Sequence, residues 1–308
     1  MGYLFLSIAL FAGATKGYCG KRTSGFVTVF RDALLVNLIR MLLCIAISFG
    51  VLITSGDLAS LRVSGMTLLI AALSGVTTAV FVTTWLLSVR KGAYMLVDVF
   101  LMLGVLVTIL CSFFAFGEEI SLRQGIGFCL LLGAVLLMCS YQGQTKGKLT
   151  LLALLLLVLC GVANGLTDFS QKLFVRNVAG GSIPVFQLYT YLFAALTLLL
   201  FYLLCGLGHH KTDAPAAPPA DTQKRIFGKI PVAMVGYIVV MAICLYLNSY
   251  FKTQAADHLT ATQLYPLNQG GSLLLSTAMA AVFFKEKPNA TGIVGVVLAF
   301  IALLTINL

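Results

Sequence analysis

Charged residues are scarce in this sequence. They account for 10% of its 308 residues, whereas 60% of the residues are hydrophobic. An ordinary soluble domain carries about 25% charged residues, which form a hydrated shell around its core. A soluble fold of this length needs such a shell, and the chain lacks the residues to build one. The composition therefore indicates a membrane protein before any motif is considered.

Residues that serve metal and nucleotide chemistry are also few. There are three histidines, and none of the eight cysteines forms a CxxC pair. The sequence contains no Walker phosphate-binding loop and no HExxH metal motif. ATP-driven transport, a metal site and enzymatic activity are therefore disfavoured, and we expect no cofactor. Most of the cysteines lie in apolar runs, which is typical of small packing residues.

Negative charge is scarcer than positive charge. The chain has 10 Asp and Glu against 20 Lys and Arg, a net charge of +10. In a soluble protein this excess would indicate a nucleic-acid partner. Here the basic residues fall mainly in short gaps between apolar runs, and no basic stripe alternates with aromatic residues. We therefore expect no nucleic acid, and we interpret the basic residues as loop charges that fix the orientation of spans in a lipid bilayer.

Long apolar runs are abundant. A membrane-spanning helix needs about 20 mostly apolar residues, and these runs are too long and too rich in leucine for barrel strands. The first run has no basic region before it and no clear cleavage site, so it is predicted to be a retained helix and not a signal peptide. The predicted spans are 2–19, 33–53, 65–88, 92–115, 122–140, 149–170, 182–205, 231–251, 259–282 and 290–307.

A polar stretch at 142–148 separates five spans from five spans. It divides the chain into two predicted repeats, 1–141 and 149–308. The segment 206–230 combines Pro and Ala with scattered charges and is predicted to be a flexible exposed loop. Because each repeat has an odd number of spans, the second copy inserts upside down, as in many secondary transporters. The predicted fold is an all-α polytopic membrane protein with ten transmembrane helices in two inverted five-helix repeats.

The two halves also resemble each other in their motifs. Glu118 follows the fourth span, and Gly127 lies nine residues after it. Glu286 follows the ninth span, and Gly295 again lies nine residues after it. The order of the helices matches throughout the two halves. This correspondence supports an internal repeat.

These junctions resemble the EamA-type repeat of the drug/metabolite transporter superfamily, as do Lys21 and Lys172 near the ends of the first and sixth spans and Arg40 in the second span. The resemblance implies a cofactor-free secondary carrier that works by alternating access. It also implies that spans one, three, four, six, eight and nine line a cavity, while five and ten pack at the periphery. The sequence departs from the family where Asp98 occupies the place in the fourth span that matches Pro266 in the ninth.

Polar groups are costly in hydrocarbon, so each one inside a span is a candidate functional residue. Asp98 lies about two turns into the fourth span, where a carboxylate can bind a cationic substrate, a proton or a structural Lys or Arg. Asn164 and Asp168 share one face of the sixth span because they are four residues apart. Lys172 continues this polar stripe and is also read as a helix-end charge.

The ninth span holds Tyr265, Asn268 and Gln269 beside Pro266, which tends to kink a helix. Amides beside a break suit an uncharged or zwitterionic ligand, and packing through small residues is the alternative interpretation.

Two further candidates complete the set, and three basic residues receive other roles. Asn248 in the eighth span is a further candidate binding residue. Trp85 in the third span is assigned either to the cavity wall or to the membrane interface. Lys16 is read as a snorkelling residue near a helix end, Lys252 as a loop charge, and Arg40 as a partner in an internal salt bridge.

The combined hypothesis is a secondary-active transporter, acting as an exporter, of small polar or amphipathic organic solutes such as amino acids, metabolites or drug-like cations. Its expected location is the plasma membrane, of the bacterial inner-membrane type, as a multi-pass protein. Its expected partners are a small-molecule substrate and a proton or counter-substrate, and it is expected to be a monomer or a homodimer. A sugar-phosphate or nucleotide-sugar antiporter and a non-transporting receptor or scaffold are the alternatives. Orientation stays open, because basic loop residues place both termini outside and the family habit places them inside.

Overall fold

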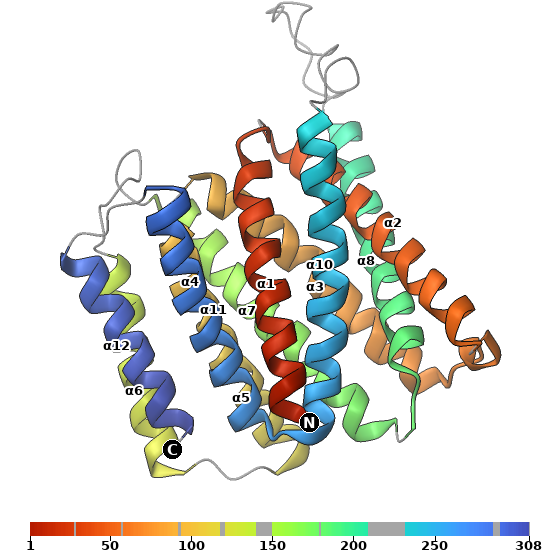
Figure 1. The fold of residues 1–308 in the computed structure, drawn as a ribbon. Helices are drawn as coiled ribbons and strands as arrows, with labels where there is room; N and C mark the ends of the chain where they lie inside the picture. The colour runs from red at the N-terminus through yellow and green to blue at the C-terminus, as the bar shows by residue number, and fades with distance from the viewer. Residues whose placement is uncertain are drawn as a thin grey trace, which may run out of the picture.

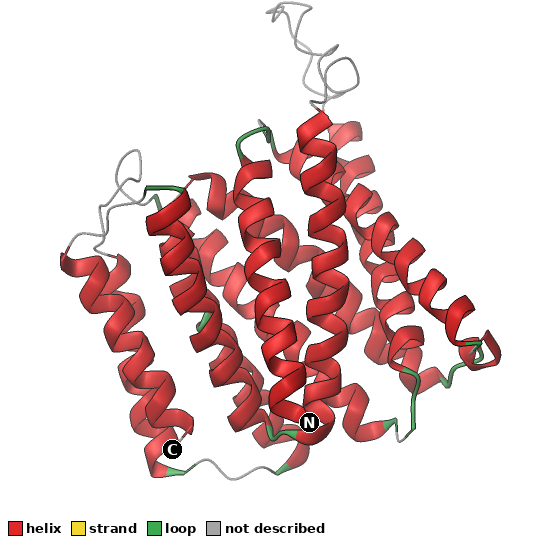
Figure 2. Cartoon of the chain, in the orientation of Figure 1, coloured by secondary structure: helices red, strands yellow, loops and turns green. Residues whose placement is uncertain are grey.

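The structure is a computed structural model. It describes residues 1–27, 29–56, 58–91, 94–117, 121–139, 150–178, 180–208, 232–285 and 290–307. Within these ranges the chain is helical and contains no strand (Figure 2). The predicted connecting loop 142–148, most of the predicted loop 206–230, and the repeat residues Glu118 and Glu286 lie outside the described residues.

Eleven α-helices and one short 3-10 helix make up the described part of the chain. They are α1 (Gly2–Ser24), α2 (Phe30–Ser55), η1 (Leu58–Leu61), α3 (Gly65–Lys91), α4 (Tyr94–Leu101), α5 (Leu103–Phe116), α6 (Leu122–Cys139), α7 (Leu151–Asn177), α8 (Ile183–Gly208), α10 (Val232–His258), α11 (Ala261–Phe283) and α12 (Ala290–Asn307).

Six stretches in the described residues are long and apolar enough to cross a membrane. They lie in α2, α3, α4 with α5, α7, α8 and α10, and α6 and α12 are shorter apolar helices. Many large apolar side chains on the bundle surface are exposed, such as Phe114 and Leu136. A water-soluble protein would bury such side chains, so these features are those of an integral membrane protein with several apolar helices.

The helices pack in pairs along the bundle (Figure 1). α1 lies against α10, α3 against α7, α2 against α8, and α6 against α12. The α6–α12 pair forms one side of the bundle and the α2–α8 pair the other, while the remaining helices lie between them. Both ends of the chain lie at the same end of the bundle. The largest apolar core cluster draws on every described α-helix except α8, and it extends to the α6–α12 pair at one side of the bundle.

The fourth predicted span, 92–115, is two helices and not one. α4 and α5 are separated at Met102, where the amide of Met102 donates to the Val99 carbonyl and the amide of Val105 donates to the Met102 carbonyl. Such three-residue hydrogen bonds tighten a helix locally. The backbone of α7 packs directly against this break, because a Cβ on Gly161 would come within 2.4 Å of the Phe100 carbonyl oxygen.

Two helices also extend well beyond the apolar runs that predicted them. α7 continues to Asn177 and α10 to His258, whereas the predicted spans ended at residues 170 and 251. Both extensions contain charged residues whose charges are satisfied inside the bundle, as described below. Sequence hydropathy ended these helices early because it counts a charge as a cost even where another helix supplies its partner.

Candidate functional site

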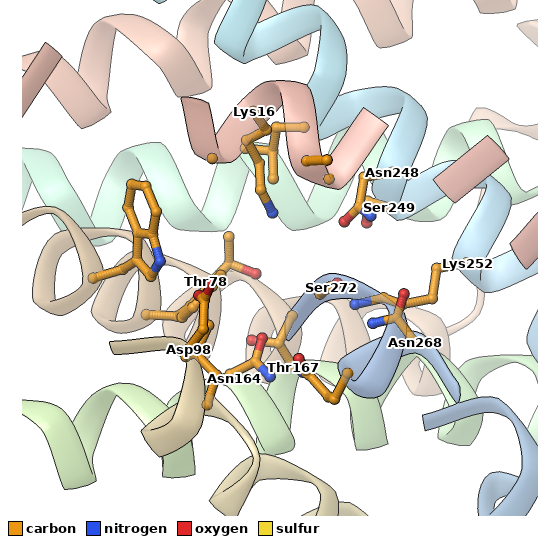
Figure 3. Close-up of a pocket in the computed structure, with 18 of the residues that line it drawn as sticks. Lys16, Thr78, Asp98, Asn164, Thr167, Asn248, Ser249, Lys252, Asn268 and Ser272 are labelled. Carbon is orange, nitrogen blue, oxygen red and sulfur yellow. The ribbon is translucent and has the colours of Figure 1, made fainter. Parts of the chain in front are cut away.

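A cavity of about 90 Å³ lies in the middle of the bundle (Figure 3). Its wall comes from seven helices: α1, α3, α4, α7, α8, α10 and α11. The lining residues are Gly13, Ala14, Lys16, Gly17, Thr78, Phe81, Trp85, Tyr94, Asp98, Leu101, Asn164, Thr167, Gln171, Tyr191, Leu245, Asn248, Ser249, Lys252, Asn268, Gln269 and Ser272. Six of these helices correspond to the spans that the family resemblance assigns to the cavity, and α8 adds Tyr191. α6 and α12 contribute no lining residue.

Small residues on α1 create room for aromatic side chains of the wall. A Cβ on Gly17 would come within 1.8 Å of the Tyr94 hydroxyl oxygen, and a Cβ on Gly20 within 2.4 Å of the Trp85 ring. Trp85 and Tyr94 meet edge to face, with their ring centroids 6.2 Å apart. Trp85 is only 7% exposed. It is therefore a wall residue of the cavity and not an anchor at the membrane interface.

Three charged side chains line the cavity: Lys16, Asp98 and Lys252. The Lys252 ammonium forms a buried ion pair with the carboxylate of Asp168 on α7. Asp98 is buried and also has an interaction partner within the protein. The Lys16 ammonium reaches toward the open centre of the cavity, with the Phe81 ring centroid 5.8 Å away (Figure 3).

Six of the eight predicted site residues lie on the cavity wall. They are Trp85, Asp98, Asn164, Asn248, Asn268 and Gln269. The Asn248 amide nitrogen donates to the Ala9 carbonyl oxygen at 2.7 Å, which holds α10 against α1. The wall is therefore rich in amide groups, which can both donate and accept hydrogen bonds.

The other two predicted residues, Asp168 and Tyr265, are buried but do not line the cavity. The Tyr265 hydroxyl donates to the Asp168 backbone oxygen at 2.7 Å, while the Asp168 side chain pairs with Lys252. Together these contacts join α7 to α10 and α11 directly behind the wall. In the structure both residues therefore support the cavity wall from behind and do not face the cavity.

Sequence reasoning missed several polar wall residues. Lys252 had been assigned to a loop, and Ser249 and Gln171 were not singled out, yet the Gln171 amide nitrogen donates to the Ser249 hydroxyl at 3.0 Å. A helical period does contain the signal, because Asn248, Ser249 and Lys252 share a face three to four residues apart. α10 had to be extended past residue 251 for that period to be recognised.

The positions of Lys172 and Arg40 differ from those expected from the sequence. The Lys172 ammonium donates to the carbonyl oxygens of Ala256 at 2.8 Å and Leu259 at 2.7 Å. It therefore caps the carboxyl end of α10, where a cation complements the exposed carbonyl groups. Arg40 is 2% exposed, but it makes no salt bridge to any described carboxylate, so the predicted internal salt bridge is wrong for the described residues.

The groups on the cavity wall are suited to binding a ligand. The wall offers ammonium, carboxylate, amide, hydroxyl and aromatic groups. Among the residues described, no group of three or more His, Cys, Asp or Glu side chains is placed to hold a metal ion.

No protein-family model and no curated protein matches this sequence. Solved structures do match it in fold, 28 chains in all. One is described only as "Crystal structure of protein". It superposes with a TM-score of 0.64 over 99% of this chain and 95% of its own, with 16% of residues identical. At that identity the likeness concerns the fold alone, and it shows that this arrangement of helices occurs in an experimentally solved protein.

Proposed function

We propose that this protein is a multi-pass secondary carrier of the drug/metabolite transporter type, which moves a small polar or amphipathic organic solute across a plasma membrane, most simply as an exporter. In this proposal α4 and α5 form one span, so the chain crosses the membrane ten times. α1 to α6 form the first repeat, and α7 to α12 form the second, inverted repeat.

The packing pattern supports an inverted repeat. α1 packs on α10 in the way that its counterpart α7 packs on α3, since each pair joins the first span of one repeat to the third span of the other. The pairs α2–α8 and α6–α12 each join counterparts to one another. α1 and α7 also run in opposite directions through the bundle (Figure 1). This pattern is the one expected of two copies related by an axis in the membrane plane.

The observation that carries the proposal is the position of the cavity. It lies midway along the helices and takes its wall from both halves of the chain. Polar groups inside an apolar bundle are costly unless they are paired or line a water-filled space. A central polar cavity between two repeats is the site that alternating access requires, because small movements of the halves can expose it to either side in turn.

A sugar-phosphate or nucleotide-sugar antiporter is the second candidate, and one specific observation favours it. Two lysine side chains, Lys16 and Lys252, line the cavity, whereas the sequence alone had placed neither there. Lysine is a common phosphate ligand. A volume of about 90 Å³ is nevertheless small for a nucleotide sugar, since sites for drug-sized ligands occupy about 300–1,000 Å³.

Reconstitution into liposomes tests the proposal. Purified protein is expected to give saturable uptake of at least one solute from a panel of amino acids, organic acids, sugar phosphates and organic cations. Asn268→Ala and Gln269→Ala are expected to raise the half-saturating concentration about three- to tenfold, since each removes a hydrogen-bonding group from the wall. Leu274→Ala is the matched control, because this α11 side chain is 47% exposed on the bundle surface.

Two outcomes separate the alternatives. Uptake that requires a counter-substrate inside the liposome would favour the antiporter. Ligand binding with no flux for any solute would contradict transport and favour a receptor or scaffold.

A further inference from the structure

The charges around the cavity are unevenly matched. Lys252 is paired with Asp168, and Asp98 has a partner within the protein. Lys16 differs from both. Among the described residues its ammonium has no hydrogen bond and no ion pair, and its cation–π partner is the Phe81 ring. A cation inside an apolar bundle is costly without a counter-charge. The cavity therefore contains one basic group that the described part of the protein leaves without a counter-charge.

The surroundings of Lys16 increase this imbalance. The formal charges that act on its ammonium are those of Lys252, Arg40 and Asp168. Asp168 is the one carboxylate among them, and it already forms an ion pair with Lys252. With Asp98, which also lines the cavity, this region holds three basic side chains and two carboxylates, an excess of one positive charge. A site with this balance attracts a negatively charged group by long-range electrostatics as well as by direct contact.

We propose that the transported solute is a small organic anion or zwitterion whose carboxylate or phosphate group binds the Lys16 ammonium. This inference rests on the proposed function, because it assigns a substrate class to the same cavity. Lys16 would supply charge-assisted hydrogen bonds to the oxyanion. Amide and hydroxyl groups, among them Asn248 and Ser249, face the same space (Figure 3) and would hold the polar body of the solute.

The size of the cavity restricts the class of solute that can bind. A water molecule needs about 10–15 Å³ of such volume, so about 90 Å³ holds only a handful of water molecules. A solute that displaces them in this conformation has the size of an amino acid, a short-chain acid or a triose phosphate. Organic cations, which the sequence alone left open, are disfavoured because they would lie beside Lys16 with no unmatched anion to receive them.

Ligand binding to purified protein in detergent tests the inference without relying on transport. The probes are succinate, L-alanine and glycerol 3-phosphate, with choline as a cation and glycerol as a neutral control. At least one of the three probes that carry a carboxylate or a phosphate is expected to raise the melting temperature of the wild-type protein, since a ligand stabilises the state that it binds. Which of them does so distinguishes a carboxylate from a phosphate.

Lys16→Gln is expected to weaken binding of the effective probe at least tenfold, and Lys16→Arg to retain most of it. Without ligand, Lys16→Gln should melt at or above the wild-type temperature, because it removes an unmatched charge. This readout separates a binding role from a structural one. Lys21→Gln is the matched control on α1, since the Lys21 ammonium donates to the Val89 carbonyl at 3.2 Å and does not line the cavity.

Three results would overturn the inference. They are binding of choline in place of the carboxylate and phosphate probes, no response to any of those probes, or equal binding of the effective probe by Lys16→Gln and the wild type. The carrier proposal can fail independently of the role of Lys16. Anion binding that depends on Lys16 with no flux in liposomes would leave this assignment intact and reject the carrier. Flux of a cation that no anion inhibits would support the carrier and reject the role of Lys16.

Discussion

The Asp168 carboxylate and the Lys252 ammonium form a buried ion pair between α7 and α10. Removing one partner leaves the other charged and desolvated, which typically costs about 3–5 kcal/mol. Asp168→Asn is therefore expected to lower the free energy of unfolding by roughly that amount, measured by denaturant titration in detergent. It also adds a second unmatched ammonium to the cavity wall.

The double variant Asp168→Asn/Lys252→Gln is the matched test of this pair. It removes both charges and is expected to recover a large part of the stability lost by Asp168→Asn, because two neutral side chains of similar shape can still form a hydrogen bond. Additive losses in the double variant would mean that the two residues act independently, contrary to the ion pair.

Lys172 stabilises the end of α10 through two carbonyl groups. Lys172→Met keeps much of the apolar length of the side chain but removes both hydrogen bonds. It is expected to cost about 2 kcal/mol of stability and to leave ligand affinity within about twofold, because the residue does not line the cavity. Arg176→Met, at an exposed position near the end of the same helix, is the control and should change stability by less than about 1 kcal/mol, since it removes only a cation–π contact with Phe116 at 5.7 Å. A loss of ligand affinity with unchanged stability would instead make Lys172 a binding residue.

At the scale of elements, α5 and α7 pack backbone to backbone. A Cβ on Gly165 would lie 2.4 Å from the Gly104 carbonyl oxygen and 2.8 Å from the Gly104 Cα. The Thr108 hydroxyl donates across the same contact to the Gly165 carbonyl at 2.9 Å. No flexible side chain is present there to move aside. The contact therefore fixes the distance between two helices that both carry, or directly continue, the cavity wall.

Gly165→Ala is expected to destabilise the protein by about 2–3 kcal/mol, because the helices must separate to admit the methyl group. Gly236→Ala is the matched control within α10, where nothing lies within 4 Å of the added Cβ. It should be neutral or stabilising by up to about 1 kcal/mol, since alanine favours helix more than glycine does. Thermal unfolding of the two variants side by side checks the contrast, and equal melting temperatures would contradict the close packing of α5 and α7.

At the scale of the whole molecule, both chain ends lie at one end of the bundle, whereas the end of α8 and the start of α10 lie at the other (Figure 1). Reporter fusions at the two termini are therefore expected to report the same side of the membrane, and a reporter inserted within 209–231 the opposite side. Termini on opposite sides would contradict an even number of spans. The same experiment decides between the orientation that the basic loop residues predict and the one that the family resemblance implies.

The apolar runs predicted the helices well because each run reports a local property, the cost of polar groups in hydrocarbon. Asn268 and Gln269 could be found in the same way, as amides within an apolar run. Lys16 and Lys252 could not. Their positions near the cavity depend on how far α1 and α10 extend and on which helix faces them, and neither property is local in the sequence.

Supporting positions were equally hard to predict. Asp168 and Tyr265 are residue types that often bind ligands. The sequence does not reveal that the side chain of each contacts a partner on another helix. The break at Met102 was likewise hidden, since no proline or glycine marks that residue and the tightened turn is instead packed against the backbone of α7.

The close contact of α5 with α7 has a consequence for how the sequence can diverge. Wall side chains that make no contact holding two helices together can be exchanged one at a time, so substrate preference can change among related chains. Gly104, Gly161 and Gly165 lack that freedom, because any side chain there collides with the backbone of the neighbouring helix. Among descendants of this sequence we therefore expect these three glycines to persist while the residues of the cavity wall are replaced.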